Sequence, residues 1–399
     1  MGRAYVCGTF DTKGPELRFL AERLEAAGIA TRLVDLSTRP HNDTVDVPAE
    51  MVAQHHPTSA AAVLGRSDRG EAIAAMAAAL ERFIIGCQDI AGIVAAGGSG
   101  NTSLVAPAMQ RLPIGLPKLI VSTVASGDVS RFVGESDICM LPAVADVQGL
   151  NAITRRILGN AASALAGMIR LRATDIETAA KPAIGLTLFG VTTPCAQQVM
   201  DMLQPDYDCI AFHAVGSGGR AMEKLVDSGL ISGVLDITTT EICDMLVGGI
   251  FPADATRFDA IIRTRVPYVV SCGALDMVNF AAASRVPDRF RDRLLHAHNP
   301  QITLMRTTVA ESIQMAEWIA AKLNRMEGEV RLLIPEAGVS ALDLPGQPFH
   351  DPRADRALFD TLAASVLPTA RRRVIRLPYA VNDPPFAAAL VDAFRSIAA

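Results

Sequence analysis

The chain has 399 residues, half of them apolar and 20% charged, which excludes a disordered chain because disorder requires few apolar residues and a high charge. The length exceeds the roughly 250 to 300 residues at which a single hydrophobic core stops growing, so two domains are expected. The net charge of -5 excludes a general affinity for nucleic acid or anionic membranes, because neutralising phosphates requires a basic surface.

The first half of the chain has the pattern of alternating strands and helices. RAYVCG (3–8) is a short apolar strand, and Leu17, Leu20 and Leu24 share one face of a helix that begins near Pro15. A polar segment that ends at Pro182 predicts a domain boundary near residue 180. Further strands are expected at 31–37, 91–98 and 118–125, and further helices at 71–86 and 150–171.

The second half restarts the same alternation, which predicts parallel sheets with helices on both faces. The expected fold is α/β, with two doubly wound, Rossmann-like or flavodoxin-like domains of mostly parallel sheet over residues 1–180 and 181–399. Ligands of such folds bind beyond the carboxyl ends of the strands. The expected strands of the second half are 183–190, 208–216, 233–239, 267–273, 302–308, 331–338 and 371–380.

The seven cysteines are odd in number, widely spread and without CxxC spacing. This pattern indicates unpaired thiols in a reducing compartment, so a cytoplasmic protein is expected. The uncharged segment 90–110 has the length of a membrane span, but GGSGNTS and Pro107 interrupt it, so no span is predicted. The first residues, MGRAYVCGTFD, lack the apolar stretch of a signal peptide.

Three loops of the first domain connect a strand to a helix and are rich in glycine and hydroxyl side chains. Glycine lets backbone N–H groups approach a phosphate, and a helix N-terminus adds free donors. Lys13 adds a cation, and Asp11 or Asp128 is a candidate ligand for Mg²⁺. The loops match neither a Walker A motif nor G-x-G-x-x-G, and the alternative is that they only form tight turns. The predicted nucleotide-binding residues are Thr9, Phe10, Asp11, Thr12, Lys13, Gly97, Gly98, Ser99, Gly100, Asn101, Thr102, Ser122, Thr123, Ala125, Ser126, Gly127 and Asp128.

The loops of the second domain carry more charge and predict a second ligand site. Arg220 and Arg306 are suited to a carboxylate or phosphate, and the catalytic candidates are His213, Arg220 and Glu241. The alternatives are that Glu241 caps a helix and that His213 is an ordinary strand-end residue. No metal site is predicted, because His296 and His298 have no adjacent third ligand. The predicted second site comprises Thr192, Thr193, His213, Gly218, Gly219, Arg220, Thr238, Thr239, Arg306 and Glu336.

Several long strings resemble, in order and over nearly the whole chain, the ATP-binding domain of the tomato mosaic virus resistance protein and its bacterial relatives. The strings are GTFDTKG, GGSGNTSL, IGLPKLIVSTVASGD, FHAVGSGGRAME, GVLDITTTE and TLMRTT. The resemblance implies a homodimer of two-domain α/β chains that binds ATP on residues 9–13, 97–102 and 122–128. Asn101 replaces the fourth glycine of the usual GGSGGT, and asparagine tolerates a positive φ better than other non-glycine residues. Some relatives carry a further barrel domain, which implies a separate barrel polypeptide as a partner here.

The residues and the resemblance together favour a nucleotide-binding protein with ATP as the first choice of ligand. A second site between the domains extends this hypothesis to an ATP-dependent enzyme that acts on a small carboxylated or phosphorylated metabolite. One alternative is a binding or regulatory module that uses nucleotide without turnover. Another is that the first site takes a sugar nucleotide or a dinucleotide, since such loops recognise phosphates more than bases.

Overall fold

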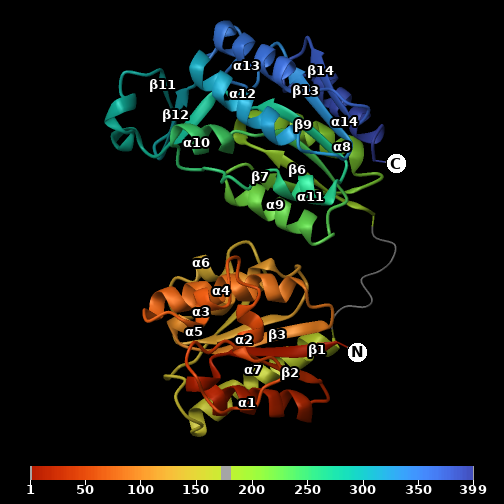
Figure 1. The fold of residues 1–399 in the computed structure, drawn as a ribbon. Helices are drawn as coiled ribbons and strands as arrows, with labels where there is room; N and C mark the ends of the chain where they lie inside the picture. Colours follow the sequence, from red (N-terminus) through yellow and green to blue (C-terminus); the bar gives the residue numbers. More distant parts are fainter. Residues whose placement is uncertain (1, 172–180, 399) are drawn as a thin grey trace. The chain divides into compact units, whose positions relative to one another are not determined.

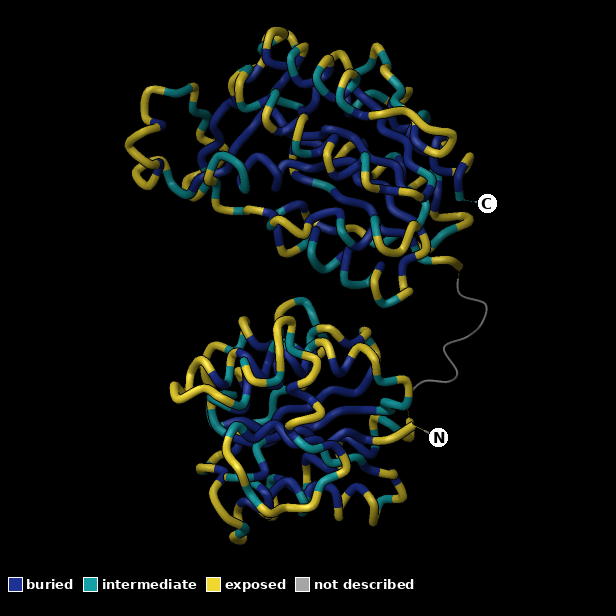
Figure 2. The backbone as a smooth tube through the Cα atoms, in the orientation of Figure 1, coloured by how far each residue is buried: buried dark blue, intermediate teal, exposed yellow. Residues whose placement is uncertain are grey.

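The computed structural model describes residues 2–171 and 181–398, which belong to two compact units (Figure 1). Each unit has a parallel sheet between layers of helices, so the predicted α/β fold class is confirmed. The domain boundary predicted near residue 180 lies outside the described residues. Figure 2 shows that the strands are the buried centre of each unit, while exposed residues lie on the outer sides of the helices and in loops.

In residues 2–171 the sheet has five strands in the order β2-β1-β3-β4-β5, and all neighbouring pairs are parallel. The chain leaves β1 for β2 on one side and then continues to β3 on the other side, so the direction of winding reverses between β1 and β3. The strand β5 is short and largely unburied, which explains why its sequence shows no buried-strand pattern. The strands are β1 (Arg3–Gly8), β2 (Thr31–Asp35), β3 (Ile90–Gly97), β4 (Lys118–Ser122) and β5 (Cys139–Pro142).

Helices cover both faces of this sheet because alternate strand residues point to opposite sides. Ala4 and Val6 of β1 pack in one cluster with α1 and α7, while Tyr5 and Cys7 pack with α4 and α5 in the other. The first helix begins at Phe10 rather than near Pro15, and its backbone departs from helical geometry at residue 13. The helices are α1 (Phe10–Ala26), α2 (Ala49–Ala53), α3 (Ala61–Leu64), α4 (Arg69–Ile85), α5 (Ser99–Arg111), α6 (Ser130–Val133) and α7 (Ala152–Arg170).

The second unit has a six-stranded parallel sheet in the order β14-β13-β9-β8-β6-β7, whose winding reverses between β6 and β8. Helices α8 and α14 pack on one face, and α9, α11, α12 and α13 pack on the other. The strands are β6 (Ala183–Leu188), β7 (Asp208–His213), β8 (Gly233–Thr238), β9 (Tyr268–Gly273), β13 (Val330–Pro335) and β14 (Arg372–Leu377). The helices are α8 (Thr193–Leu203), α9 (Ser217–Asp227), α10 (Glu241–Val247), α11 (Asp259–Thr264), α12 (Val309–Leu323), α13 (Pro352–Ser365) and α14 (Pro384–Arg395).

A small antiparallel sheet follows β9 and was not predicted. It consists of β10 (Met277–Phe280), β11 (Leu295–Asn299) and β12 (Ile302–Arg306), in the order β10-β12-β11. The prediction that residues 302–308 form a strand of the main sheet is therefore wrong. An apolar run such as ITLMR predicts a strand but not its partner, and here a tight turn at Asn299 pairs it with β11.

Candidate functional site

The candidate site is a cavity of about 120 Å³ at the carboxyl edge of the N-terminal sheet, where the winding reverses between β1 and β3. Open α/β sheets bind ligands at this type of position. The loops after β1 and β3 form two of its walls, and the loop after β2 and the start of α4 form the others. The cavity is lined by Thr9, Asp11, Thr12, Thr38, Arg39, Arg69, Ile73, Gly100, Asn101 and Leu104.

Two acceptor atoms of residues that line this cavity have no hydrogen-bond partner among the described residues. They are Oδ1 of Asp11 and Oδ1 of Asn101, and both atoms are buried. The amide nitrogen of Asn101 donates to the carbonyl of Ala96 at 3.2 Å, which fixes the side chain. A buried acceptor without a partner costs about 1 to 3 kcal/mol, so these two oxygens indicate a place for donors of a ligand or of water.

The two helix starts at this edge differ in whether their amides are free. The first amides of α1 are occupied, because Phe10 N donates to Asp35 at 3.2 Å and Asp11 N donates to the Ser37 hydroxyl at 3.0 Å. The N-terminus of α5 has no side-chain cap. It faces Arg69, whose guanidinium lies 3.8 Å from where a Cβ on Gly100 would be. The α5 end is therefore the one that can receive an anion.

The cation at this site is not the lysine that the sequence indicated. The ammonium of Lys13 donates to the carbonyl of Val147, in the loop after β5, and Lys13 does not line the cavity. Arg39 and Arg69 line it instead. Sequence reasoning missed both arginines, because each stands in an ordinary polar loop or helix start and only the folded chain brings them to the glycine-rich loop.

The glycine-rich loop itself contains two different kinds of glycine. A Cβ on Gly97 would lie 2.8 Å from Cβ of Asn101, so this position requires glycine. A Cβ on Gly98 would have only the Thr123 hydroxyl near it, at 3.6 Å, which is ordinary contact. Asn101 lies in the first turn of α5 and its φ is not positive. Asn101, which replaces the fourth glycine of GGSGGT, therefore does not need a positive φ.

The third predicted loop supports the other two rather than lining the cavity. The hydroxyls of Thr102 and Ser122 are 2.7 Å apart, and Thr123 N donates to the carbonyl of Gly97. Residues 126–128 are exposed, and Asp128 accepts a hydrogen bond from Ser130 N at 2.9 Å. Hydrogen bonds from Ser130 lower the pKa of the Asp128 carboxyl. The remaining predicted residues differ in exposure, since Phe10 is in the core, Ser99 is exposed and Ala125 is half-buried.

A second cavity, of about 240 Å³, shares Thr38 and Arg39 with the first and lies against the loop after β2. Its wall includes His41, whose Nε2 is 2.8 Å from the Asp35 carboxylate. The hydrogen bond with Asp35 raises the pKa of His41 above its ordinary value. Asp35 is itself buried and also binds Phe10 N and Ser37, so it holds the ends of β1 and β2 together.

The carboxyl edge of the second unit is closed at the corresponding reversal, between β6 and β8. The hydroxyls of Thr192 and Thr238 are 2.7 Å apart across the reversal between β6 and β8, and both residues and Thr239 are fully buried. The same loops contribute to a cluster of apolar side chains that covers this edge. Its buried members are Phe189, Val191, Ala274, Met277, Leu304 and Phe349. The structure thus brings three predicted threonines together but encloses them in protein.

His213 and Arg220 lie beside the edge strand β7. The imidazole of His213 is 5.1 Å from the ring of Phe189, and partial burial lowers its pKa. A Cβ on Gly218 would lie 1.9 Å from the carbonyl of His213, so close packing of α9 on β7 explains this glycine. Arg220 is half-buried in α9, and the Thr193 hydroxyl donates to the carbonyl of Phe189.

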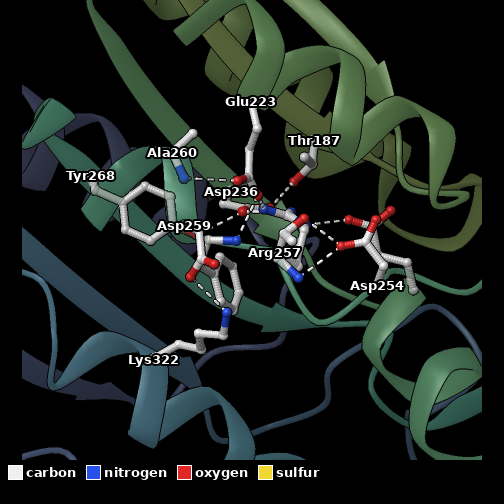
Figure 3. A network of polar contacts seen from close by, with 12 residues as sticks. Thr187, Glu223, Asp236, Asp254, Arg257, Asp259, Ala260, Tyr268 and Lys322 are labelled. Carbon is white, nitrogen blue, oxygen red and sulfur yellow. Dashed lines mark hydrogen bonds and ion pairs between the residues drawn. The ribbon is translucent and has the colours of Figure 1, made fainter. Parts of the chain in front are cut away.

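Glu241 belongs to a buried ion-pair network around Arg257. Figure 3 shows Arg257 with two further members of this network, Glu223 and Asp236. Arg257 binds Glu241, Glu223 at 2.9 Å and Asp236 at 2.7 Å, and the second oxygen of Glu241 accepts from Gly216 N. Burial raises the pKa of Glu241, against the opposing effect of Arg257. Because both carboxylate oxygens are bonded and the residue is fully buried, Glu241 is a structural partner of Arg257 and does not cap its own helix.

Arg306 and Glu336 lie toward the other side of the same sheet. Arg306 is buried, and it donates to the carbonyl of Phe349 at 2.6 Å and pairs with Asp355. Glu336 accepts from Arg376 at 2.7 Å. The ten residues of the predicted second site therefore do not form one cavity. They divide into the buried threonines, the His213 and Arg220 region, and the Arg306 region.

Comparison with known proteins shows one family over both units. Residues 2–174 match the N-terminal domain of the uncharacterised protein family UPF0261, and residues 181–398 match its C-terminal domain. A UPF0261 protein of Rhizobium meliloti (strain 1021) is 57% identical over the full length of both chains. The ToMV resistance protein Tm-1 of Solanum lycopersicum is 44% identical over 99% of this chain and 56% of its own length.

A UPF0261 protein of Clostridium tetani is 41% identical over 96% of both chains. Among solved structures, a thioesterase domain from the curacin biosynthetic pathway aligns with 54% of this chain at 11% identity, with a TM-score of 0.23. In the described residues, no helix has the length and apolar character needed to cross a membrane. The agreement over both units and with full-length relatives identifies the chain as a member of the uncharacterised protein family UPF0261.

Proposed function

We propose that the N-terminal unit binds a nucleotide, with ATP as the first choice, in the cavity at the reversal between β1 and β3. One observation carries this proposal. Two arginines and two residues from the uncapped start of α5 line the cavity, and two of its lining residues carry buried acceptors that have no partner among the described residues. A nucleotide offers anionic oxygens and hydroxyl donors in one molecule, and therefore matches both groups of residues.

The two groups suggest how the ligand lies. Arg39, Arg69 and the first amides of α5 are suited to phosphate oxygens. Asp11 and Asn101 are suited to ribose hydroxyls, which donate to acidic or amide oxygens in related dinucleotide sites. Asp11 also has the chemistry to hold Mg²⁺ that travels with the phosphates. These assignments place the phosphates at the first amides of α5 and the sugar between Asp11 of α1 and Asn101 of α5.

The size of the site supports a ligand larger than phosphate. The first cavity alone has about 120 Å³, and the second cavity, of about 240 Å³, shares the wall residues Thr38 and Arg39 with it. Together they reach the range of roughly 300 to 1,000 Å³ that is usual for small-molecule pockets. His41 in the second cavity has a raised pKa and adds positive charge at mildly acidic pH.

Calorimetric titration with ATP and Mg²⁺ tests the proposal. Arg69→Ala and Arg39→Ala should each weaken binding by about tenfold or more, since both arginines line the cavity and a charged hydrogen bond contributes about 1.5 to 3 kcal/mol. The matched control is Arg82→Ala, an exposed arginine at the other end of α4. Equal affinity of the wild type and both site variants would remove the proposed site.

The identity of the nucleotide is tested on the same protein. Titration with ADP, a sugar nucleotide and NAD, together with mass spectrometry of ligand released from the purified protein, compares the alternatives directly. Tighter binding of ATP than of the others supports the first choice. A preference for a sugar nucleotide or NAD in the same Arg69-dependent site would keep the site and change its ligand.

Turnover, assembly and location extend the proposal. Incubation with ATP and a pool of small organic acids separates an enzyme from a regulatory module, and loss of product in His213→Ala or Arg220→Ala supports the enzyme.

A cytoplasmic homodimer, with a barrel-domain polypeptide as a further partner, is proposed from the family resemblance and the seven free cysteines. Light scattering of the purified chain measures the dimer, and a monomer at micromolar concentration contradicts it.

A further inference from the structure

A loop and a helix start of the second unit bring three side chains with metal-ligand chemistry together. Asp343 and His350 lie in the loop after β13, and Asp355 lies in the first turn of α13. One ligand atom from each of these residues lies within 4.8 Å of the others. Asp343 and Asp355 are buried, whereas His350 is exposed, so the group extends from the protein interior to its surface.

The acidic side chains around this group outnumber the one buried arginine beside them. Arg306 pairs with Asp355 and lies 3.4 Å from Asp343. Asp276 is also buried and interacts electrostatically with Arg306 and Asp355. Three aspartate side chains thus lie around one guanidinium, so acidic ligand groups outnumber the cation beside them.

Asp276, which interacts electrostatically with Asp355, has a buried oxygen without a partner among the described residues. Asp276 accepts from the Ser340 hydroxyl at 2.7 Å through one oxygen. Its other oxygen, Oδ1, is buried and has no hydrogen-bond partner among the described residues. Native proteins leave few such atoms, and an unplaced water or ion is a common reason. Ser340 lies in the loop that also carries Asp343 and His350.

The loop is held in place by contacts that do not use the exposed ligand. The Arg306 guanidinium donates to the carbonyl of Phe349, directly before His350, and Val339 N donates to Asp343 at 3.0 Å. A cavity of about 340 Å³ reaches His350 and Asp355 from outside. A small ion therefore has both a held set of ligands and a route to them.

We propose that Asp343, His350 and Asp355 bind a divalent metal ion of the Zn²⁺ or Mn²⁺ class, with Arg306 as a positioning residue. Two carboxylates and one imidazole suit these ions, and a softer thiolate-binding ion has no cysteine here. Zn²⁺ requires ligand distances of about 2.0 to 2.2 Å, which small side-chain rotations provide. Three protein ligands leave a further position for water or substrate on the side of the cavity.

The sequence predicted no metal site, because these three ligands do not form a recognisable motif. The three ligands are spaced 7 and 5 positions apart on a loop and a helix start, and this spacing matches no common metal motif. The inference also does not depend on nucleotide binding, because all its residues belong to the second unit. Failure of either proposal leaves the other intact.

The test uses the full chain without an affinity tag, freed of metal with a chelator and measured without nucleotide. Mn²⁺ binding is followed by electron paramagnetic resonance of the free ion, and Zn²⁺ binding by calorimetry. We expect one ion per chain. His350→Ala should weaken binding by about tenfold or more, and it leaves the buried core unchanged because His350 is exposed.

Control variants and a second ligand variant keep the test decisive. His298→Ala and Asp360→Asn change an exposed histidine and an exposed aspartate elsewhere in the same unit and should leave affinity unchanged. Asp355→Asn should weaken binding as His350→Ala does, with circular dichroism to check that it folds. The proposal is overturned when the wild type binds neither ion at millimolar concentration, or when His350→Ala binds both as tightly as the wild type.

Discussion

The carboxyl edges of the two parallel sheets share a topology and differ in what occupies them. In the N-terminal unit, the edge has a cavity with two arginines and two buried acceptors that lack partners among the described residues. In the C-terminal unit, the threonines at the reversal bind each other and lie among apolar side chains. Strand order thus fixes where a site can form, while the loops decide whether it is open.

The difference has a structural cause. The loop after β6 contributes Phe189 and Val191, and two further segments, the small antiparallel sheet and the loop after β13, contribute Met277, Leu304 and Phe349. In the N-terminal unit, the segments that follow β1 and β3 have Thr9, Thr12 and Gly100 at the lining positions. Substitutions that act on stability in the second unit and on ligand binding in the first unit test this comparison.

The largest effect on stability is expected for Arg257→Met. Its removal leaves Glu223, Asp236 and Glu241 buried without their shared partner, and breaking a buried pair costs about 3 to 5 kcal/mol. Trp318 is the only tryptophan and packs 5.8 Å from the ring of Phe258. Its fluorescence during denaturant unfolding therefore reports on the second unit.

The matched control for that change is Arg263→Met, since Arg263 pairs with Asp227 at 2.6 Å in a partly exposed position. Exposed pairs contribute about 0 to 1 kcal/mol. The two variants should therefore differ clearly in the free energy of unfolding. Similar losses in both variants would show that the Arg257 network does not hold the closed edge of the second unit.

A smaller effect is expected for the threonine pair at that edge. Thr192→Val leaves Thr238 and Phe189 N without the hydroxyl that binds them, which costs about 1 to 3 kcal/mol. Thr238→Val should cost less, because Thr192 keeps its contacts with Phe189. The double variant should lose less than the sum of the two single variants, by at least about 0.5 kcal/mol.

Trp318 fluorescence during denaturant unfolding measures all three threonine variants. Simple additivity would mean that the two hydroxyls act independently and that apolar packing alone closes the edge. A coupling term would show that the threonines form a satisfied pair, in contrast to the unsatisfied acceptors of the N-terminal cavity.

Much of the fold was predictable because its strands are apolar runs bounded by glycine. The runs AGIVAAGG and GVLDITT form fully or nearly buried strands. Their continuous apolar character and their short length identify them as strands in the sequence. The missed strands lack that signal, since β5 is half-exposed and β11 contains His296 and His298. Strand partners were not predictable, because an apolar run does not specify whether its neighbour is parallel.

The sequence predicted the position of the candidate site in the fold better than it predicted the side chains that line the site. The glycine-rich loop after β3 and the loop after β1 both line the cavity, whereas Arg39 and Arg69 have no distinguishing pattern in the sequence. The burial of the threonine side chains also could not be predicted from the sequence. Nothing in LDITTTE shows that its threonines are enclosed, because the covering residue Phe349 is more than 100 positions away.

A third, pH-dependent effect is expected in the N-terminal unit. The hydrogen bond with Asp35 raises the pKa of His41 in the folded protein above the value of about 6.5 in an unfolded chain. Its contribution to stability is therefore full below pH 6.5 and is lost as the pH rises through the folded pKa. The contribution should be about 1 kcal/mol or less, since the pair is near the surface.

Histidine NMR signals measure this pKa directly, and Asp35→Asn should lower it. Hydrogen exchange in peptides of β1 and β2 gives the stability of the unit. The wild type should exceed His41→Gln in stability at pH 6, and the difference should shrink by pH 8. A difference that grows with pH would mean that His41 is stabilising in its neutral form.

The smallest effect on stability is expected for Asp11→Ala, which should nevertheless weaken ATP binding by about tenfold. Oδ1 of Asp11 is buried without a partner among the described residues, so its removal relieves a desolvation cost. That gain offsets the loss of a negative charge in the first turn of α1, which contributes about 0.3 to 1 kcal/mol. The net change in unfolding free energy should stay within about 0.5 kcal/mol.

Hydrogen exchange of α1 and calorimetry with ATP measure the two quantities on one variant, with Glu22→Ala on the exposed side of the same helix as control. A group kept for binding lowers affinity when removed and leaves stability unchanged, whereas a structural group does the reverse. A clear loss of stability with unchanged affinity would place Asp11 with the threonines of the closed edge. A loss of affinity at unchanged stability would show that the unsatisfied oxygen of Asp11 at the open edge is kept for a ligand.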